Sequence, residues 1–333
     1  MEAKTKTTTI DMESNSLMHR QAYALIQFIP KIYLALLFLI FLTTYSPTQA
    51  GAGPQTYNCD KLLTKTDGQR FRIFKEPWVL GKPFEGLTPD PQAAIEAWQS
   101  HCLEEIDVWY GAALQTTDKQ ATIPFARLSK HARERPLKGD IRVIDVESWP
   151  IQGDLATMAG SRAKYTDLFW SVKSLSESKV VGFYNFPPVP DYWRIKAGIG
   201  AQKFREWQKD NDFYRSLAAA VDAFFPSLYT VFEENIAAWR ETTDPKLAEI
   251  ERYRQNKPVI PFIMPYYHEG NRKKGGTEID SDFLQGQIEY LFNSTDGVII
   301  WTALEDWDEH AQWWVALSGF LDARATEIAK SAN

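Results

Sequence analysis

The chain has 333 residues, 44% of them hydrophobic and 24% charged, which is the balance of a soluble globular protein with a sizeable core. The net charge of −6 comes without any basic block, so nucleic-acid binding, which leaves a basic patch on a protein, is not expected.

The first 50 residues predict a targeting segment. Lys31 precedes the uncharged apolar run IYLALLFLIFL (32–42), and SPTQA (46–50) places small or short side chains at Thr48 and Ala50, as signal-peptidase sites do. The sequence therefore predicts a signal peptide over 1–50 and a secreted or periplasmic protein. The alternative is an uncleaved membrane anchor, although the run is short for a span of about 20 residues.

From residue 70 onward, predicted strands alternate with predicted helices. In chain order they are strand 70–74, helix 90–106, strand 141–147, helix 154–176, strand 179–186, helix 201–220, strand 223–229, helix 231–255, strand 257–267, helix 280–293, strand 297–304 and helix 308–330. Asp90 and Asp308 suit helix N-caps. This alternation indicates a parallel sheet, and it predicts that residues 51–333 form a single (β/α) TIM-type barrel of seven or eight strands.

Cysteine and histidine patterns give no metal site and no cofactor. The two cysteines, Cys59 and Cys102, have no metal-ligand spacing around them, and the five histidines form no cluster. A Cys59–Cys102 disulfide is expected in an oxidising compartment, with two free thiols as the alternative. No Gly-rich phosphate-binding loop follows any predicted strand, which speaks against a nucleotide site.

Two carboxylates end the predicted strand 141–147. Residues i and i+2 of a strand point to the same face, so Asp145 and Glu147 would project side by side. In a barrel the active site lies at the carboxyl ends of the strands, where the other strands place Tyr184, Tyr229, Tyr266, Tyr267 and Trp301. Two acids among aromatic side chains are typical of a sugar-cleaving site, whereas each aromatic alone is compatible with packing at the barrel rim. The second acidic stretch, EDWDEH (305–310), is interpreted as a solvated loop.

Five motifs at these strand ends resemble the hyaluronidase family of glycoside hydrolases (family 56). They are VIDVESW (143–149), GFYNFP (182–187), FPSLY (225–229), PVIPFIMPYY (258–267) and GVIIW (297–301), and the similarity spans about residues 120–305. The resemblance implies a retaining endo-glycosidase that hydrolyses N-acetylhexosaminide linkages of a polysaccharide by substrate-assisted catalysis, an exception to the scheme with two carboxylates.

The resemblance also implies a role for each matching residue. Glu147 would protonate the leaving oxygen and then activate water, while Asp145 would hold the acetamido N–H and favour the protonated form of Glu147. Tyr184 and Tyr229 would hydrogen-bond the acetamido group, and Trp301 would form the floor of its pocket. Trp149 and Tyr266, within the same motifs, are further candidate substrate contacts.

The chain departs from the family pattern at several places. Val146 stands where the family has Trp, and Pro150 stands where it has an Arg that would suit a uronate carboxylate. That loss speaks against hyaluronan itself as the substrate, and the family's Cys-rich C-terminal module has no counterpart. Two alternatives stay open: a chitinase-like glycosidase, which would need an Asp where Val143 stands, and a catalytically silent carbohydrate-binding barrel.

Overall fold

The strands of this protein are short, parallel and joined by helices. The computed structural model describes residues 57–76, 90–114, 123–134, 139–175, 179–303 and 307–331, and the predicted signal segment 1–50 lies outside them. The strands are β1 (Arg72–Lys75), β2 (Leu103–Glu105), β3 (Asp107–Tyr110), β4 (Ile141–Asp145), β5 (Val180–Phe183), β6 (Phe262–Ile263) and β7 (Gly297–Ile300). They form a parallel four-stranded sheet of order β2-β1-β7-β6 and a parallel three-stranded sheet of order β3-β4-β5.

The two sheets are linked on both sides. On one side β2 and β3 follow each other directly in the chain, so that residues 103–105 pair with β1 and residues 107–110 pair with β4. On the other side single parallel bridges join Tyr184 to Phe225, Phe224 to Val259 and Ser227 to Phe262. Gly182 allows this approach, since a Cβ there would lie 2.5 Å from the carbonyl oxygen of Ala223.

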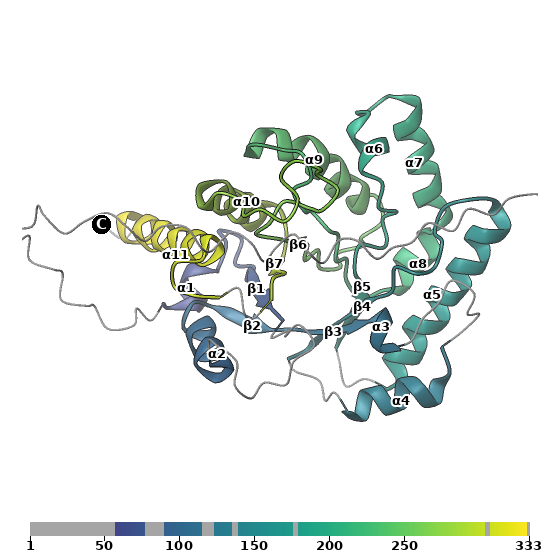
Figure 1. The fold of residues 1–333 in the computed structure, drawn as a ribbon, viewed down its shortest axis with the longest axis horizontal. Helices are drawn as coiled ribbons and strands as arrows, with labels where there is room; N and C mark the ends of the chain where they lie inside the picture. The colour runs from purple at the N-terminus through teal and green to yellow at the C-terminus, as the bar shows by residue number, and fades with distance from the viewer. Residues whose placement is uncertain are drawn as a thin grey trace, which may run out of the picture. The chain divides into compact units, whose positions relative to one another are not determined.

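The helices are arranged around the strands (Figure 1). They are α1 (Cys59–Leu62), α2 (Pro91–Ser100), α3 (Gly111–Leu114), α4 (Phe125–Glu134), α5 (Leu155–Leu175), α6 (Tyr192–Lys196), α7 (Gln202–Phe213), α8 (Arg215–Ala220), α9 (Ile236–Glu251), α10 (Ser281–Ser294) and α11 (Gln312–Ser331). Among the described helices, none combines the length and apolar character required to cross a bilayer.

Several predicted elements differ from the structure; the strand predicted at 257–267, for example, is reduced to β6, and the helix predicted at 201–220 is divided into α7 and α8. The helix predicted at 90–106 ends at Ser100, because Cys102 takes a positive φ of 65°, and the chain continues as β2 and β3. The strand predicted at 223–229 is reduced to isolated bridges, since Pro226 has no N–H for a ladder. The last helix begins at Gln312, and Asp308 accepts from the backbone N–H of His310 in the preceding turn instead of capping that helix.

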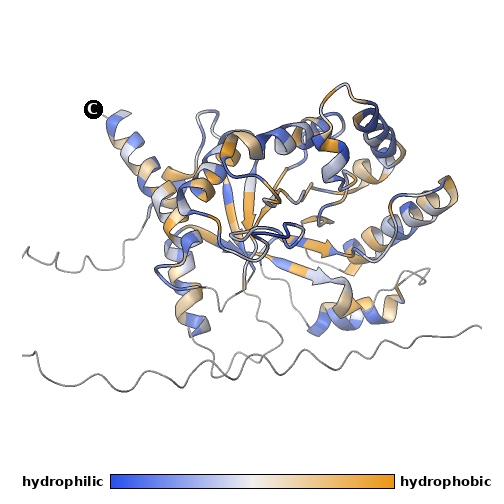
Figure 2. Ribbon diagram, turned by 45° about the horizontal axis from the view of Figure 1, so that its top comes forward, coloured by the Kyte–Doolittle hydropathy of each residue, from blue (hydrophilic) through white to orange (hydrophobic). Residues whose placement is uncertain are grey.

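Most of the strands are coloured as hydrophobic (Figure 2), and the buried residues of β4 belong to clusters on both of its faces. One buried cluster draws on β1, β3, β4, β6 and β7 and on the segments around residues 106, 223–225 and 260; its members are Phe74, Ile106, Val108, Ile141, Val143, Ala223, Phe225, Ile260, Phe262 and Ile299. Two larger clusters lie between the strands and the helices. The first cluster therefore occupies the space that the strands share, below the residues at their carboxyl ends.

The predicted disulfide between Cys59 and Cys102 is confirmed, with a Cα–Cα distance of 5.3 Å. It ties α1 to the turn that ends α2 and closes a loop across a sequence separation of 43. Every cysteine of the described residues is therefore paired.

Replacing Cys59 and Cys102 by serine should lower the free energy of unfolding by about 2–4 kcal/mol, because the bond limits the freedom of the unfolded chain. Denaturant unfolding of the double variant measures this effect, with the single variant Cys59→Ser as a control that loses the same bond. A midpoint equal to that of the wild type would show that the bond adds no stability.

Candidate active site

The two acids lie on the same face because β4 alternates strictly. Its odd-numbered side chains Ile141 and Val143 belong to the shared inner cluster, and Asp145 continues that row. The even-numbered Ile144 and Val146 face the cluster under the helices. Glu147, two residues beyond Asp145, lines the same cavity, as the spacing predicted.

A hydrogen bond from behind the strand fixes the backbone between the acids. Tyr165 on α5 donates its hydroxyl to the carbonyl oxygen of Val146 at 2.6 Å. Its ring is buried between Trp149 and Phe183, each with a centroid 5.0 Å away. The main chain of residues 145–147 is thus held by packing that does not take part in the cavity itself.

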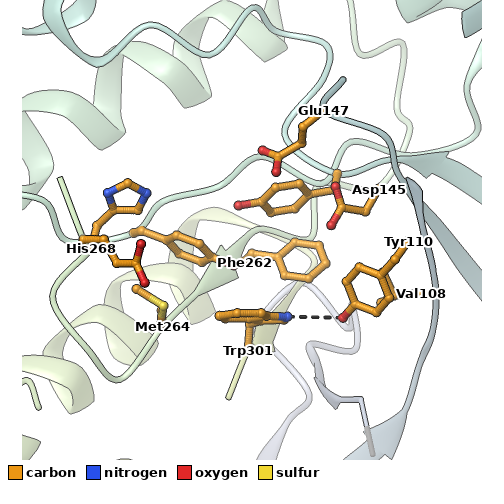
Figure 3. A pocket seen from close by; sticks show the side chains of 11 residues that line it. Val108, Tyr110, Asp145, Glu147, Phe262, Met264, His268 and Trp301 are labelled. Carbon is orange, nitrogen blue, oxygen red and sulfur yellow. Dashed lines mark hydrogen bonds between the residues drawn. The ribbon is translucent and has the colours of Figure 1, made fainter. Parts of the chain in front are cut away.

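The acids open into a cavity of about 340 Å³. Its walls come from the ends of several strands and the loops after them: Val108, Tyr110, Asp145, Glu147, Tyr184, Tyr229, Phe262, Met264, His268, Glu269 and Trp301. Figure 3 shows Asp145 and Glu147 entering from one side, with Trp301 across the space below them and His268 at the far end. Asp145 is half-buried and Glu147 is exposed at the cavity mouth.

The electrostatics of the cavity centre on Asp145. Burial, the carboxylate of Glu147 and the carboxylate of Glu76 together raise the pKa of Asp145 to about 7. Asp145 is therefore the acid whose pKa is raised. The sequence had predicted instead that Glu147 would be the acid held protonated by its neighbour. Near neutral pH the carboxyl of Asp145 is therefore partly protonated.

Glu76 is a third acid beside the site, and it follows β1 directly. It is buried and accepts a hydrogen bond from the Tyr110 hydroxyl, which in turn accepts from the indole N–H of Trp301 at 3.3 Å (Figure 3). Tyr110 stands opposite Asp145 in the β3–β4 register. A chain of polar contacts thus joins the ends of β1, β3 and β7 on the side of the cavity next to Asp145.

Tyr184, Tyr229 and Trp301 all line the cavity, which confirms the predicted placement of Tyr229 and Trp301 with the acids. The ring centroids of Tyr184 and Tyr229 lie 6.2 Å apart, and those of Tyr229 and Trp301 also lie 6.2 Å apart. Burial raises the pKa of Tyr184 to about 12 and that of Tyr229 well above its usual value. Both hydroxyls therefore stay protonated and able to donate hydrogen bonds at neutral pH.

The other two predicted contacts lie elsewhere. Trp149 is buried in the core and lines a neighbouring cavity of about 380 Å³, which shares Glu147 and Tyr184 with the first. Tyr266 does not line the acid cavity, because its backbone pairs with Glu278 and turns this segment away; Met264 and His268 line the cavity instead. Neither Trp149 nor Tyr266 therefore faces both acids in the way the motif suggested.

Sequence reasoning missed Glu76, Tyr110 and His268. The predicted first strand ended at residue 74, two residues before Glu76. Tyr110 lay just after the predicted helix 90–106, in a stretch to which no strand was assigned. One sequence signal could have revealed Tyr110: Ile106, Val108 and Tyr110 occupy every second position, as the residues on one face of a strand do. Among the described residues, no group of three or more His, Cys, Asp or Glu is arranged to hold a metal ion.

Comparisons with known proteins find likeness in structure only. No protein-family model matches the chain, and no curated protein matches it by sequence. Among solved structures, bee venom hyaluronidase is similar with 15% identity and a TM-score of 0.49, over 78% of this chain and 98% of that one. The same enzyme in complex with a hyaluronic acid tetramer matches with 14% identity and a TM-score of 0.48, over 78% of this chain and 95% of the other.

A more distant likeness is to the catalytic domain of a GH53 protein from Ignisphaera aggregans, with 13% identity and a TM-score of 0.37, covering 69% of this chain and 72% of that domain. At such identities the role of each cavity residue has to be judged from its own surroundings.

Proposed function

We propose that the protein is a retaining glycosidase that cleaves N-acetylhexosaminide linkages in a polysaccharide by substrate-assisted catalysis. The observation that carries this proposal is the pairing of Asp145 and Glu147 on one wall of a cavity whose other walls are aromatic. The five motifs shared with hyaluronidases lend it further support. Aromatic rings suit the apolar faces of sugars, and the two acids suit protonation of a glycosidic oxygen.

In this mechanism Glu147 at the cavity mouth donates its proton to the leaving oxygen. The acetamido oxygen of the substrate attacks its own anomeric carbon, the glycosidic bond breaks, and a cyclic oxazolinium-type intermediate forms. Asp145 accepts a hydrogen bond from the acetamido N–H and stabilises the positive charge that develops on it. Glu147, now ionised, takes a proton from water as the water opens the ring at the anomeric carbon.

The raised pKa of Asp145 is compatible with these roles. In the free protein the carboxyl of Asp145, whose pKa is raised to about 7, is partly protonated near neutral pH. When the acetamido N–H reaches Asp145, the ionised form of that carboxyl is favoured, and the proton is released to the neighbouring Glu147. Substrate binding thereby prepares the acid for the first step.

The fold and location follow the same proposal. On one side of the two sheets parallel bridges run through residues 224–227, and on the other side β2 continues directly into β3. Together with the shared inner cluster, these links support a seven-stranded (β/α) barrel over residues 51–333. The Cys59–Cys102 bond and the apolar run 32–42 support export to an oxidising compartment.

The pH dependence of kcat/KM should follow the carboxyl pair. Asp145 loses its proton as the pH rises through about 7, and the proposed mechanism needs that proton in the site, so kcat/KM should fall over this range. Glu76→Gln removes a negative charge that raises the pKa of Asp145, so the fall should move to lower pH. Glu76→Asp keeps the charge and should leave the fall closer to its wild-type position. A fall that does not move in Glu76→Gln contradicts the coupling.

The test of the proposed function is the release of new reducing ends from defined polymers. The protein is incubated separately with hyaluronan, chondroitin and chitin oligomers, and product size and anomeric configuration are followed by chromatography and NMR. We expect cleavage of at least one N-acetylhexosamine-containing polymer with retained configuration. Binding of all three without any new reducing end would instead favour a silent carbohydrate-binding barrel.

A further inference from the structure

A separate cavity of about 570 Å³, called the second cavity below, combines exposed aromatic rings with cationic side chains. Its lining residues include Trp193, Phe232, Glu234, Arg272, Lys273 and Lys274. None of them lines the acid cavity, and none belongs to the five motifs.

The aromatic part is a platform that the protein holds open to solvent. Trp193 is 66% exposed and Phe232 is 41% exposed, and their ring centroids lie 5.5 Å apart with an angle of 39° between the rings. Exposed apolar rings placed next to each other mark binding surfaces more often than isolated exposed residues do. Two tilted rings side by side offer one continuous apolar surface for a sugar face.

A buried carboxylate fixes this platform. Glu233, 3% exposed, accepts a hydrogen bond from the Tyr192 hydroxyl at 2.8 Å and from the backbone N–H groups of Val231 and Phe232 at 2.8 and 2.9 Å. It therefore ties the start of α6, which carries Trp193, to the segment that carries Phe232. The rings are preorganised, so a ligand does not have to order them on binding.

The cationic part comes from the loop 268–276. Lys274 pairs with Glu234 at 3.2 Å, whereas Arg272 and Lys273 form no ion pair with any residue in the described part of the chain. The buried side chain of Asn271 accepts from the backbone N–H groups of Lys273 and Lys274, both at 3.0 Å, and so fixes this loop. Three cations face one carboxylate here, in a chain whose net charge is −6.

The platform and the acid cavity are connected through the chain and through space. His268 and Glu269 line the acid cavity, and the next residues of the same loop, 270–274, line the second cavity. A smaller cavity of about 180 Å³ shares Tyr229 and His268 with the acid cavity and is also lined by Tyr192. The centroid of the Tyr192 ring lies 5.1 Å from that of Trp193 and 5.7 Å from that of Phe232. Contacts between neighbouring residues therefore connect the acid cavity with the platform.

We propose that Trp193, Phe232, Arg272 and Lys273 form a second carbohydrate subsite that holds an acidic sugar unit of the polymer cleaved at Asp145 and Glu147. The inference rests on the proposed function for the identity of the polymer, but the binding itself does not require cleavage. The rings pack against the apolar face of the sugar, and the guanidinium of Arg272 and the ammonium group of Lys273 donate hydrogen bonds to its carboxylate or sulfate group.

The test is direct binding by calorimetry in a Glu147→Gln background, so that the ligand stays intact. The probes are length series of carboxylate-bearing hyaluronan oligomers, sulfated chondroitin oligomers and neutral chitin oligomers. Trp193→Ala should weaken binding of long acidic oligomers about three- to tenfold, since a stacked aromatic contact is lost. Arg272→Gln with Lys273→Gln should weaken acidic oligomers by a similar factor, reduce the salt dependence of binding, and leave neutral oligomers unchanged.

Matched controls come from outside the cavity. Trp170→Ala removes a ring that is 57% exposed on α5, and Lys203→Gln with Lys209→Gln removes two exposed cations on α7. Both should bind every oligomer as the parent does. The proposal is overturned if the parent binds no acidic oligomer, if the platform variants bind like the parent, or if the charge variants weaken neutral oligomers equally.

These outcomes separate the two proposals. Platform-dependent binding of acidic oligomers by a protein that releases no reducing ends would support the subsite and refute the glycosidase. Cleavage that proceeds identically in all platform variants, on short and long acidic substrates, would support the glycosidase and refute the subsite.

Discussion

Glu147→Gln should lower kcat/KM by about 10²–10⁴, because a positioned proton donor contributes that much to the rate. The amide keeps the size of the side chain but has no proton to give to the leaving oxygen. Glu147 is exposed at the cavity mouth, so the fold should survive the change. Steady-state hydrolysis of the preferred polymer, together with a thermal melt of each variant, measures both effects.

The matched control is Glu309→Gln, which removes an exposed carboxylate from the second acid-rich stretch without touching the cavity. Its kcat/KM should equal that of the wild type. Asp145→Asn should lose about 10²–10³, since the charge that stabilises the acetamido N–H is gone. Full activity in Glu147→Gln with an unchanged melt would remove this residue from the mechanism.

A polymer stripped of its N-acetyl groups should not be cleaved even by the wild-type protein. In substrate-assisted catalysis the acetamido oxygen is the nucleophile, and an intramolecular nucleophile in good geometry contributes on the order of 10⁵ or more in effective molarity. Its removal should therefore reduce the rate to the background level. Reducing-end release from paired acetylated and deacetylated chitin oligomers of equal length measures this directly.

Binding of the deacetylated oligomer must be measured alongside, so that loss of affinity is not mistaken for loss of the nucleophile. A thiazoline analogue of the cyclised intermediate should inhibit competitively, because it resembles the bound intermediate more than the substrate does. Equal turnover of the acetylated and deacetylated oligomers would end the substrate-assisted mechanism while leaving a glycosidase assignment intact.

The periodicity of a single strand was enough to predict the core of the site. In VIDVE the alternation of β4 places Asp145 and Glu147 on one face, and the aromatic residues at three later strand ends reach the same cavity. The roles of Glu76 and Tyr110 could not be predicted, because they depend on contacts between residues far apart in the chain. Glu76 matters because Tyr110 lies against it, and the register that brings Tyr110 opposite Asp145 is set by pairing between β3 and β4.

Local patterns also misled where a backbone feature interrupts them. The apolar spacing of 90–106 fits a helix throughout, but the positive φ at Cys102 ends the helix and starts a strand instead. Tyr266 belongs to an apolar run that looks continuous, yet between Pro261 and Pro265 the strand is limited to Phe262 and Ile263. The direction of a side chain beyond such a break follows from tertiary contacts and not from the run itself.

The even positions of β4 show how this strand could tolerate change. Arg142 is buried, donates to Asp107 on β3 at 2.7 Å and stacks over the Trp109 ring, whereas Asp145 faces the opposite side. Replacing Arg142 alone would leave the buried carboxylate of Asp107 without its partner and lower the free energy of unfolding by about 3–5 kcal/mol. The even positions of β4 thus serve packing throughout, whereas the odd row passes from the buried core at Ile141 and Val143 to the acid at Asp145. A library that leaves this strand untouched and varies loop residues of the acid cavity, such as His268 and Glu269, could therefore explore new substrate preferences while the scaffold stays folded.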